Sequence, residues 1–417
     1  MRNVYKLAVA GLHKKAAFRG RSSTIPYGRQ WIDEDDIQAV VEVLRSDWLT
    51  TGPKVTEFER IVADYSGAEH GVAVNSGTAA LHCAMNAAGV GPGDEVIVPP
   101  MTFASTVNSV VFQGGTPVFA DVDPETLLMD PAEVEQKVTD KTKAIIAVDY
   151  AGQPCDFERL REIAATRDVA LIDDACHALG AEYKGRKIGT WADMTVFSFH
   201  PVKHITTGEG GMVLTQSDEY EKSLRLFRNH GISTDHYQRA RQGSWFYEMV
   251  DLGFNYRISD IQCALGISQM KKIYDFLQRR RQIAARYDEA FKNIEGVTPL
   301  AVRQEVVHAY HLYVVRIDPE KHGKNRDTFF QQLQAKGVGV NVHYIPVYLH
   351  PFYQKRFATG PGLCPVAETV YQQIVSLPIF PAMNKNDVER VIRCVETLGG
   401  HKLDNGPAEF NKKRQLI

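Results

Sequence analysis

The stretch SFHPVKHITTGEGG, residues 198–211, connects two short runs of β-branched and aromatic residues and contains a single lysine, Lys203. Upstream of it, Asp173 and Asp174 directly follow the hydrophobic run Ala170–Ile172. Such runs alternate with helical patterns along the chain, which predicts an α/β fold with a mostly parallel central sheet. The runs are residues 96–98, 117–119, 144–148, 170–172, 195–197 and 212–214.

The residues that follow these runs are the first candidates for a functional site. The carboxyl ends of parallel strands meet at one edge of the sheet, where ligands bind. Asp174, Ser198 and Lys203 all follow predicted strands. A lysine amine can hold an aldehyde cofactor as a Schiff base, and a carboxylate facing the ring nitrogen keeps a pyridinium protonated. This order of residues therefore predicts a pyridoxal 5'-phosphate (PLP) site, with Lys203 and Asp174 in these two roles.

Two further residues, His177 and Phe103, are expected near the cofactor ring. One of the paired acids Asp173 and Asp174 is expected to cap a following helix while the other faces the ring nitrogen. His177 would then lie one helical turn after Asp174, where it could orient that carboxylate or contact the ring. Phe103 comes just past another strand end and is predicted to stack on the ring, with a core phenylalanine as the alternative.

The segment Asn75–Leu81 is predicted to bind a phosphate. It joins the end of an apolar run to a helical pattern, so that backbone N–H groups at the helix start could face an anion. The residues at this start are Gly77, Thr78 and Ala79, and the hydroxyl of Ser198 would complete the cradle. For the segment taken alone, simple packing of small residues is the alternative.

Length and composition set the broad class of the protein. The chain has 417 residues, 44% of them hydrophobic and 24% charged, with a formal net charge of −2, which is ordinary for a two-domain globular enzyme and gives no reason to expect nucleic acid. No apolar run approaches the length of a membrane-spanning helix. The six cysteines have no metal-ligand spacing and are expected to be reduced, as in a cytoplasmic protein. They are Cys83, Cys155, Cys176, Cys263, Cys364 and Cys394.

Periodicity divides the chain into four parts: an N-terminal extension over residues 1–24, a large PLP-binding domain over 25–275, a smaller α+β domain over 276–398 and a tail over 399–417. The extension is basic, and a targeting peptide is the alternative reading of it. A helix is predicted from Asp33, a long connecting helix over 261–294 and a last helix over 386–398. Strands are predicted over 311–315 and 338–343, and a long loop over 229–249.

Several motifs in this order make the chain resemble the PLP-dependent nucleotide-sugar aminotransferases of the DegT/DnrJ family, over about residues 25–398. The matching stretches are residues 47–53, 75–81, 174–180, 198–211, 228–231 and 253–257. The resemblance implies an aspartate aminotransferase-like fold (fold type I). It also implies that Lys203 bonds the cofactor, Asp174 pairs with its ring nitrogen, Phe103 stacks on it, and Thr78, Ala79 and Ser198 hold its phosphate. In the family an asparagine, here Asn255, reaches the phosphate of the neighbouring subunit, which implies a homodimer with shared active sites.

The resemblance also implies the substrates, L-glutamate as amino donor and a nucleotide-linked ketosugar as acceptor. Residues 148–152, 199–207 and 343–348 are most similar to the branch of the family that acts in pseudaminic acid biosynthesis, so a UDP-linked 4-keto-6-deoxy-hexose is expected. The candidates for the sugar or nucleotide side are Tyr27, Arg228, His343 and Tyr344. Related 4-aminotransferases for other UDP-, GDP- or dTDP-linked sugars share most of these motifs.

One departure from the family pattern raises a different activity. Lys203 is followed by His204, and a related branch of sugar 3-dehydratases carries histidine in place of the lysine itself. Because the lysine is retained here, amino transfer is favoured over elimination. A cofactor-binding regulator without enzymatic activity is disfavoured, because the chain has no strongly basic or helix-turn-helix-like appendage.

Overall fold

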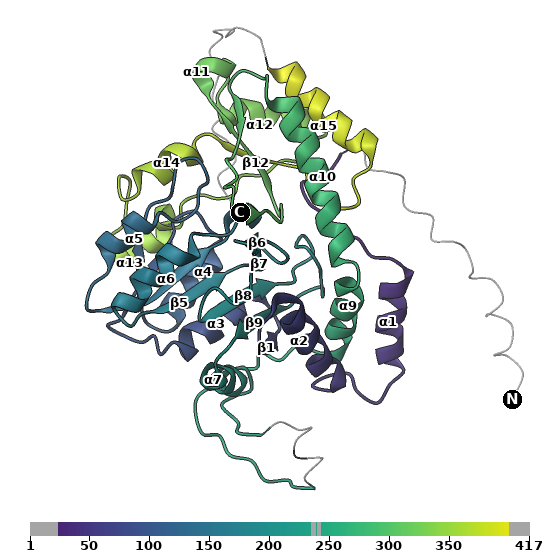
Figure 1. Ribbon diagram of the computed structural model, residues 1–417, viewed down its shortest axis with the longest axis vertical. Coiled ribbons are helices and arrows are strands. Elements are labelled where there is room, and N and C mark those ends of the chain that lie inside the picture. The colour runs from purple at the N-terminus through teal and green to yellow at the C-terminus, as the bar shows by residue number, and fades with distance from the viewer. Residues whose placement is uncertain (1–23, 235–238, 240–242, 400–417) are drawn as a thin grey trace, which may run out of the picture.

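The computed structural model describes residues 24–234, 239 and 243–399 (Figure 1). The predicted N-terminal extension and C-terminal tail lie outside these residues, except for their innermost positions 24 and 399. Within the described part, no helix has both the length and the apolar character needed to cross a membrane.

A seven-stranded sheet forms the centre of the larger part of the molecule (Figure 1). Its strand order is β1-β9-β8-β5-β4-β2-β3, and only β9 runs antiparallel to its neighbours, so the predicted mostly parallel sheet is confirmed. All six predicted runs are strands. The strands are β1 (His70–Val74), β2 (Glu95–Val98), β3 (Thr116–Phe119), β4 (Thr142–Val148), β5 (Ala170–Asp174), β8 (Met194–Ser198) and β9 (Gly211–Thr215).

Helices cover this sheet, and their ends are set by local capping. The helix start predicted at Asp33 is confirmed, because Asp33 and Asp36 form a reciprocal capping box. Helix α3 packs on β8 and β9, and α6 packs on β5. The helices of this part are α1 (Glu34–Leu44), α2 (Pro53–Ser66), α3 (Gly77–Ala87), α4 (Ala104–Phe112), α5 (Pro131–Lys137), the short η1 (Tyr150–Gly152), α6 (Phe157–Thr166), α7 (Asp218–Arg228) and α9 (Asp260–Met270).

The rest of the chain follows the long helix α10 (Ile273–Phe291), which runs from α9 up to α15 in Figure 1. It includes a small antiparallel sheet of order β10-β12-β13, and β11 pairs with the hairpin β6–β7 of the larger part. The strands are β6 (Glu182–Tyr183), β7 (Arg186–Lys187), β10 (Val297–Pro299), β11 (Val306–Val307), β12 (Tyr313–Ile317) and β13 (Ile374–Leu377). The helices are α11 (Pro319–His322), α12 (Arg326–Ala335), η2 (Val347–Leu349), α13 (Pro351–Phe357), α14 (Pro365–Tyr371) and α15 (Lys385–Leu398).

Two of the predicted elements differ from the structure. The single helix expected over 261–294 is divided into α9 and α10 by a turn at Lys271 and Lys272, where the Lys272 amine binds Asp33 and Asp36 at the start of α1. The strand expected over 338–343 is absent, since that segment makes only isolated bridges at Val338 and Asn341.

Two hydrophobic clusters stabilise the fold. The larger one surrounds the seven-stranded sheet and extends to η2, α13 and α14, through residues such as Tyr348 and Val370. The smaller one joins α10, α12, α15 and the small sheet. Ile25 belongs to this smaller cluster, because its backbone binds Gly337 and Gly339. The start of the described chain therefore packs on the later part of the molecule, beside the site described next.

Candidate active site

Strand β5 ends in the two predicted acids, whose side chains point to opposite faces because successive residues of a strand alternate. Asp174 is buried, and its Oδ2 accepts a hydrogen bond of 2.6 Å from the Thr106 hydroxyl. Asp173 is also buried, and burial, together with the charges of Asp149 and Asp174, raises its pKa well above the ordinary value. No helix follows β5 directly, because turns occupy the chain up to Gly180, where φ is 81°. The expectation that one of the two acids caps a helix is therefore wrong.

Lys203 lies in the loop between β8 and β9, whose ends are held together because Ser198 pairs with Gly211. Burial lowers the pKa of Lys203, against the opposing effects of the nearby Cys176 and Asp174. Among the residues that the structure describes, Lys203 forms no ion pair. A lowered pKa increases the neutral amine, which is the form that attacks a carbonyl and accepts a proton.

His177 is buried in the turns after β5, not on a helix as expected. Its Nε2 lies 3.1 Å from the Tyr344 hydroxyl, and its ring centroid lies 4.3 Å from that of His311. Burial lowers the pKa of His177 well below the ordinary value, so the ring is neutral. Its hydrogen bond is with Tyr344, so a role in orienting Asp174 stays a prediction.

Phe103 is the residue that precedes α4, at the carboxyl end of β2. Its side chain is 59% exposed, which excludes the alternative of a core phenylalanine. Its ring centroid lies 6.2 Å from that of Tyr344, on the side of the molecule that carries Lys203 and Asp174. An exposed aromatic ring at this edge of the sheet is free to stack on a planar ligand.

The start of α3 has the form expected of a phosphate cradle. Ser76 caps the helix, and its hydroxyl accepts a hydrogen bond from the Ala79 N–H, which is therefore already engaged. A Cβ atom on Gly77 would lie only 2.9 Å from the Cβ of Ser198 and 3.1 Å from its hydroxyl oxygen. Only glycine lets the Ser198 hydroxyl approach the helix start this closely, so helix dipole and hydroxyl converge where a phosphate would bind.

Three of the four candidates for the substrate side lie together. The rings of Tyr27 and His343 are 5.5 Å apart, and Tyr344 follows His343 directly. His343 Nδ1 lies 2.8 Å from the Ser376 hydroxyl, and its carbonyl accepts a hydrogen bond from the Tyr150 hydroxyl. Tyr344 also links this group to His177, so the group adjoins the cluster around Lys203.

The fourth candidate, Arg228, makes its contacts elsewhere. Its guanidinium pairs with the buried Glu59 of α2 and donates a hydrogen bond of 2.7 Å to the carbonyl of Ala73. Glu59 accepts the Ala73 N–H, and Arg225 donates to Glu59 and to the carbonyl of Gly71. These side chains satisfy the free edge of β1, which would otherwise be open to pairing with another strand. A substrate role for Arg228 stays a prediction.

Asn255, which is expected to reach the phosphate of the neighbouring subunit, is exposed at the root of the segment between α7 and α9. Its carbonyl accepts a hydrogen bond from Asn75, and it forms an isolated bridge with Asn229. Figure 1 shows that the described residues of the segment between α7 and α9 extend away from the body of the molecule below α7. The described residues of this segment include a run of exposed apolar side chains: Trp245, Phe246, Tyr247, Met249, Val250 and Leu252.

The sequence reasoning missed Thr106 and Arg280. Thr106 is fully buried on α4 and links Asp174 to Thr102, and two threonines one helical turn apart on a buried face were the available signal. Arg280 is fully buried on α10, and nothing in the local sequence distinguishes it from its neighbours Arg279 and Arg281.

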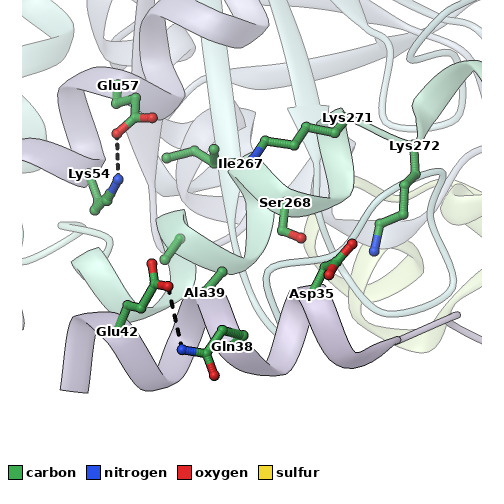
Figure 2. Close-up of a pocket in the computed structure, with 11 residues that line it drawn as sticks. Asp35, Gln38, Ala39, Glu42, Lys54, Glu57, Ile267, Ser268, Lys271 and Lys272 are labelled. Carbon is green, nitrogen blue, oxygen red and sulfur yellow. Dashed lines mark hydrogen bonds and ion pairs between the residues drawn. The ribbon is translucent and has the colours of Figure 1, made fainter. Parts of the chain in front are cut away.

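A groove of about 440 Å³ lies between α1, α2 and α9, away from these residues (Figure 2). Within the groove, Lys54 pairs with Glu57, and the side-chain amide of Gln38 donates a hydrogen bond to Glu42. None of the predicted site residues lines it. The candidate site is therefore the edge of the central sheet around Lys203, Asp174 and Phe103.

Comparison with known proteins agrees with this assignment. The model of the DegT/DnrJ/EryC1/StrS aminotransferase family matches residues 30–396. The spore coat polysaccharide biosynthesis protein SpsC of Bacillus subtilis is 42% identical, over 91% of this chain and 98% of its own length. The UDP-4-amino-4-deoxy-L-arabinose–oxoglutarate aminotransferase of Shewanella sediminis is 38% identical, over 91% of this chain and 99% of its own.

Solved structures agree as well. PseC of Helicobacter pylori, an aminotransferase involved in the biosynthesis of pseudaminic acid, superposes with a TM-score of 0.84 at 32% identity, over 90% of this chain and 99% of that one. The PLP form of the putative sugar aminotransferase Spr1654 of Streptococcus pneumoniae has the same TM-score at 34% identity, over 90% and 98% of the two chains.

Proposed function

Because this chain belongs to the DegT/DnrJ/EryC1/StrS aminotransferase family, whose members are PLP-dependent sugar aminotransferases, we propose that it moves an amino group from L-glutamate to C4 of a UDP-linked 4-keto-6-deoxy-hexose. The proposed acceptor is UDP-2-acetamido-2,6-dideoxy-β-L-arabino-hexos-4-ulose, which would give UDP-4-amino-4,6-dideoxy-N-acetyl-β-L-altrosamine. The similarity to PseC and the stretches 148–152, 199–207 and 343–348 support this choice. The six cysteines of this chain are free thiols, which suits a cytoplasmic enzyme.

The arrangement of Lys203, Asp174 and Phe103 at one sheet edge is the observation that carries the proposal. Lys203 would bond the aldehyde of PLP, Asp174 would face the ring nitrogen, and Phe103 would pack on the ring. The start of α3 at Gly77 and Thr78, with the Ser198 hydroxyl, would hold the phosphate. When bound, PLP supplies an electron sink for the carbon that loses its proton.

Lys203 is also the group best suited to move the protons of the reaction. Its lowered pKa makes the neutral amine available to take a proton from the α-carbon of the donor and to return one to C4 of the sugar. Thr106 and the backbone N–H of Cys176 donate hydrogen bonds to Asp174 and so hold its carboxylate in place. Tyr27, His343 and Tyr344, which lie together and are linked to His177, would contact the sugar or nucleotide.

A matched pair of variants tests the assignment of the lysine. Lys203→Ala is expected to abolish both the visible absorbance of the bound cofactor and turnover, while the protein stays folded by circular dichroism. Lys137→Ala changes a lysine on α5 that forms its ion pair with Glu133, and this control is expected to behave as the wild type. Turnover or visible absorbance retained by Lys203→Ala would refute the role of this lysine.

The substrate is tested with UDP-, GDP- and dTDP-linked 4-keto-6-deoxy sugars, each incubated with glutamate and analysed by mass spectrometry and NMR. We expect the UDP-linked sugar to gain an amine at C4 while glutamate is consumed in equal amount. A GDP- or dTDP-linked product would refute the proposed nucleotide. A product that has lost the C3 hydroxyl and gained no amine at C4, with the glutamate nitrogen released as ammonia, would identify a 3-dehydratase. We do not expect that outcome, because Lys203 is retained and the neighbouring His204 is engaged through its Nε2 with the carbonyl of Ala309.

We also propose that the protein works as a homodimer with shared active sites, through the exposed apolar segment 244–252. Trp245 is 85% exposed there, and five further apolar side chains on the segment are exposed. Surfaces of this kind are typical of subunit interfaces. Asn255 lies at the root of the segment, in the position expected to reach the phosphate of a neighbouring subunit.

The oligomeric state is measured by analytical ultracentrifugation. Trp245→Ser with Leu252→Ser is expected to convert the dimer to a monomer and to weaken cofactor binding, since the two are linked by mass action. Tyr274→Ser changes an aromatic residue of α10 that is 68% exposed outside the segment, and is expected to leave the dimer intact. A wild-type monomer, or a double variant that remains fully dimeric, would refute this interface.

A further inference from the structure

Arg280, on the connecting helix α10, is a buried cation without a countercharge. Its side chain is among the largest fully buried ones, with 1% exposure. Within the described ranges it has no carboxylate partner, and its Nε has no hydrogen-bond acceptor. Burying an unpaired charge costs several kcal/mol, on the order expected from continuum estimates. A cation retained at such a cost calls for an explanation from its contacts.

One nitrogen of the guanidinium binds backbone carbonyls from two segments of the later part of the chain. Nη1 donates to the carbonyls of Tyr310 at 3.1 Å, His311 at 3.3 Å and Ile379 at 3.0 Å. The first segment places the His311 ring against His177. The second binds the N-terminal segment, since the Ile379 N–H donates to the carbonyl of Tyr27. Both segments therefore position residues of the candidate site.

The other nitrogen faces the backbone of the lysine itself. Nη2 lies 3.4 Å from the carbonyl oxygen of Val202 and 3.5 Å from that of Lys203. These contacts are long, but water does not compete for the guanidinium, because it is buried. One rigid fork thus connects the loop between β8 and β9 to the segments on the far side of the site.

The neighbours of Arg280 show what an ordinary position on this helix does. Arg279 donates to the carbonyl of Met383 at 2.7 Å, and Arg281 donates to those of His308 at 3.0 Å and Gly180 at 3.2 Å. Both tie α10 to other segments, but neither donates a hydrogen bond to the backbone of the loop between β8 and β9 that carries Lys203 (the lysine loop). Arg280 alone of this run combines complete burial with contact to Lys203.

We propose that Arg280 is a positioning residue for Lys203, which fixes the loop between β8 and β9 against the later part of the chain and places a positive charge without a carboxylate partner near Lys203. The inference rests on the proposed role of Lys203. A nearby positive charge disfavours protonation of an amine, so it favours the neutral form that the reaction needs. Burial lowers the pKa of Arg280 to about 10, so the guanidinium is still charged at neutral pH.

Other groups also act on the amine, and the effect of Arg280 has to be separated from theirs. Asp174 and Cys176 oppose the lowering of the Lys203 pKa, whereas burial and Arg280 produce it. The histidines close to Lys203 have pKa values lowered by burial and are neutral at pH 7. They are His177 in the turns after β5, His204 in the lysine loop, His311 before β12 and His343 after it.

The test compares Arg280→Met and Arg279→Met in the cofactor-loaded enzyme by titrating the visible cofactor absorbance with pH. Arg280→Met removes the buried charge and is expected to raise the midpoint by about one pH unit. Arg279→Met removes a partly exposed charge from the adjacent position and is expected to shift the midpoint by less than about 0.2 unit, because solvent screens it. An Arg280→Met midpoint equal to that of the wild type would overturn the proposal.

Arg280→Lys covers the case in which Arg280→Met does not fold or does not load. It keeps the charge but loses the fork, so residues 200–206 and 308–312 are expected to exchange their amide hydrogens faster together, while the midpoint stays near that of the wild type. Unchanged exchange in both segments would overturn the proposal. Failure of the proposed function is distinguishable, because it appears as visible absorbance that survives Lys203→Ala, whatever the Arg280 variants show.

Discussion

Replacing Glu59 with glutamine is expected to destabilise the protein strongly, although Glu59 lies outside the candidate site. Its carboxylate is 4% exposed and receives Arg228, Arg225 and the N–H of Ala73. Burial alone would raise the pKa of Glu59, but the two arginines and the Ala73 N–H outweigh it and hold the pKa below the ordinary value. Glutamine keeps an acceptor for Ala73 but leaves Arg228 as a buried cation at the edge of β1.

The size of the effect follows from these contacts. A hydrogen bond to a charged group contributes about 1.5–3 kcal/mol, and removal of one partner of a buried ion pair costs about 3–5 kcal/mol. The Arg225 side chain is 37% exposed, so solvent screens its share, and most of the loss comes from Arg228, which is 13% exposed. We expect Glu59→Gln to lower the free energy of unfolding by about 3 kcal/mol.

Urea unfolding followed by circular dichroism measures this difference, and pH separates the ion pair from packing. Since the folded pKa of Glu59 is depressed, the stability it confers is fully present above its unfolded pKa, near 4.5, and is lost as the pH falls through the folded value. The gap between wild type and variant is therefore expected to be widest near pH 7 and to narrow from pH 5 downwards.

Glu57→Gln, on the same helix, is the matched control. Its carboxylate pairs with Lys54 and is 37% exposed, so its loss is expected to cost less than about 0.5 kcal/mol. The reasoning fails if Glu59→Gln and Glu57→Gln destabilise the protein equally, or if the effect of Glu59→Gln does not depend on pH.

Three further predictions concern the site. Asp174→Asn is expected to lower turnover by about 100-fold or more while the cofactor still binds, because a neutral amide cannot pair with a protonated ring nitrogen; near-normal rates at saturating cofactor would point to another acid. Thr106→Val is expected to cost about tenfold in turnover, whereas Thr106→Ser, which keeps the hydroxyl bound to Asp174, stays within about twofold; equal rates for the two variants would contradict this. Phe103→Ala is expected to raise the dissociation constant of the cofactor about tenfold in a fluorescence titration, and unchanged binding would remove the stacking role.

The central sheet could be predicted from the sequence because buried parallel strands appear as short, continuous β-branched runs. Strand β1 did not give this signal, since its sequence HGVAV contains glycine and alanine and pairs antiparallel at the edge. The division between α9 and α10 also left no local signal. It depends on Lys272, which reaches Asp33 and Asp36 more than 200 positions away in the chain.

The place of the candidate site was predictable, because Lys203 and Asp174 were expected just after strands and the structure places both at the same edge of the central sheet. The residues that support them were not, because their partners are distant in sequence. Thr106 lies 68 positions before Asp174 in the chain, and Arg280 lies 77 positions after Lys203. The expected helix after Asp174 was wrong for a local reason, since β5 is followed by turns that end at Gly180.

The lysine loop is connected differently from the rest of the candidate site, because β8 and β9, which flank it, pair antiparallel. The strands pair from Met194 with Thr215 to Ser198 with Gly211, so the ladder closes locally, whereas Asp174 and Phe103 reach the same edge through parallel strands and crossover connections. Residues 194–215 thus form a hairpin whose two strands pair without a crossover connection. Such a hairpin can form early in folding, before the long-range crossovers are made, whereas the contacts of its loop with Arg280 and Ala309 form only after the later part of the chain has packed.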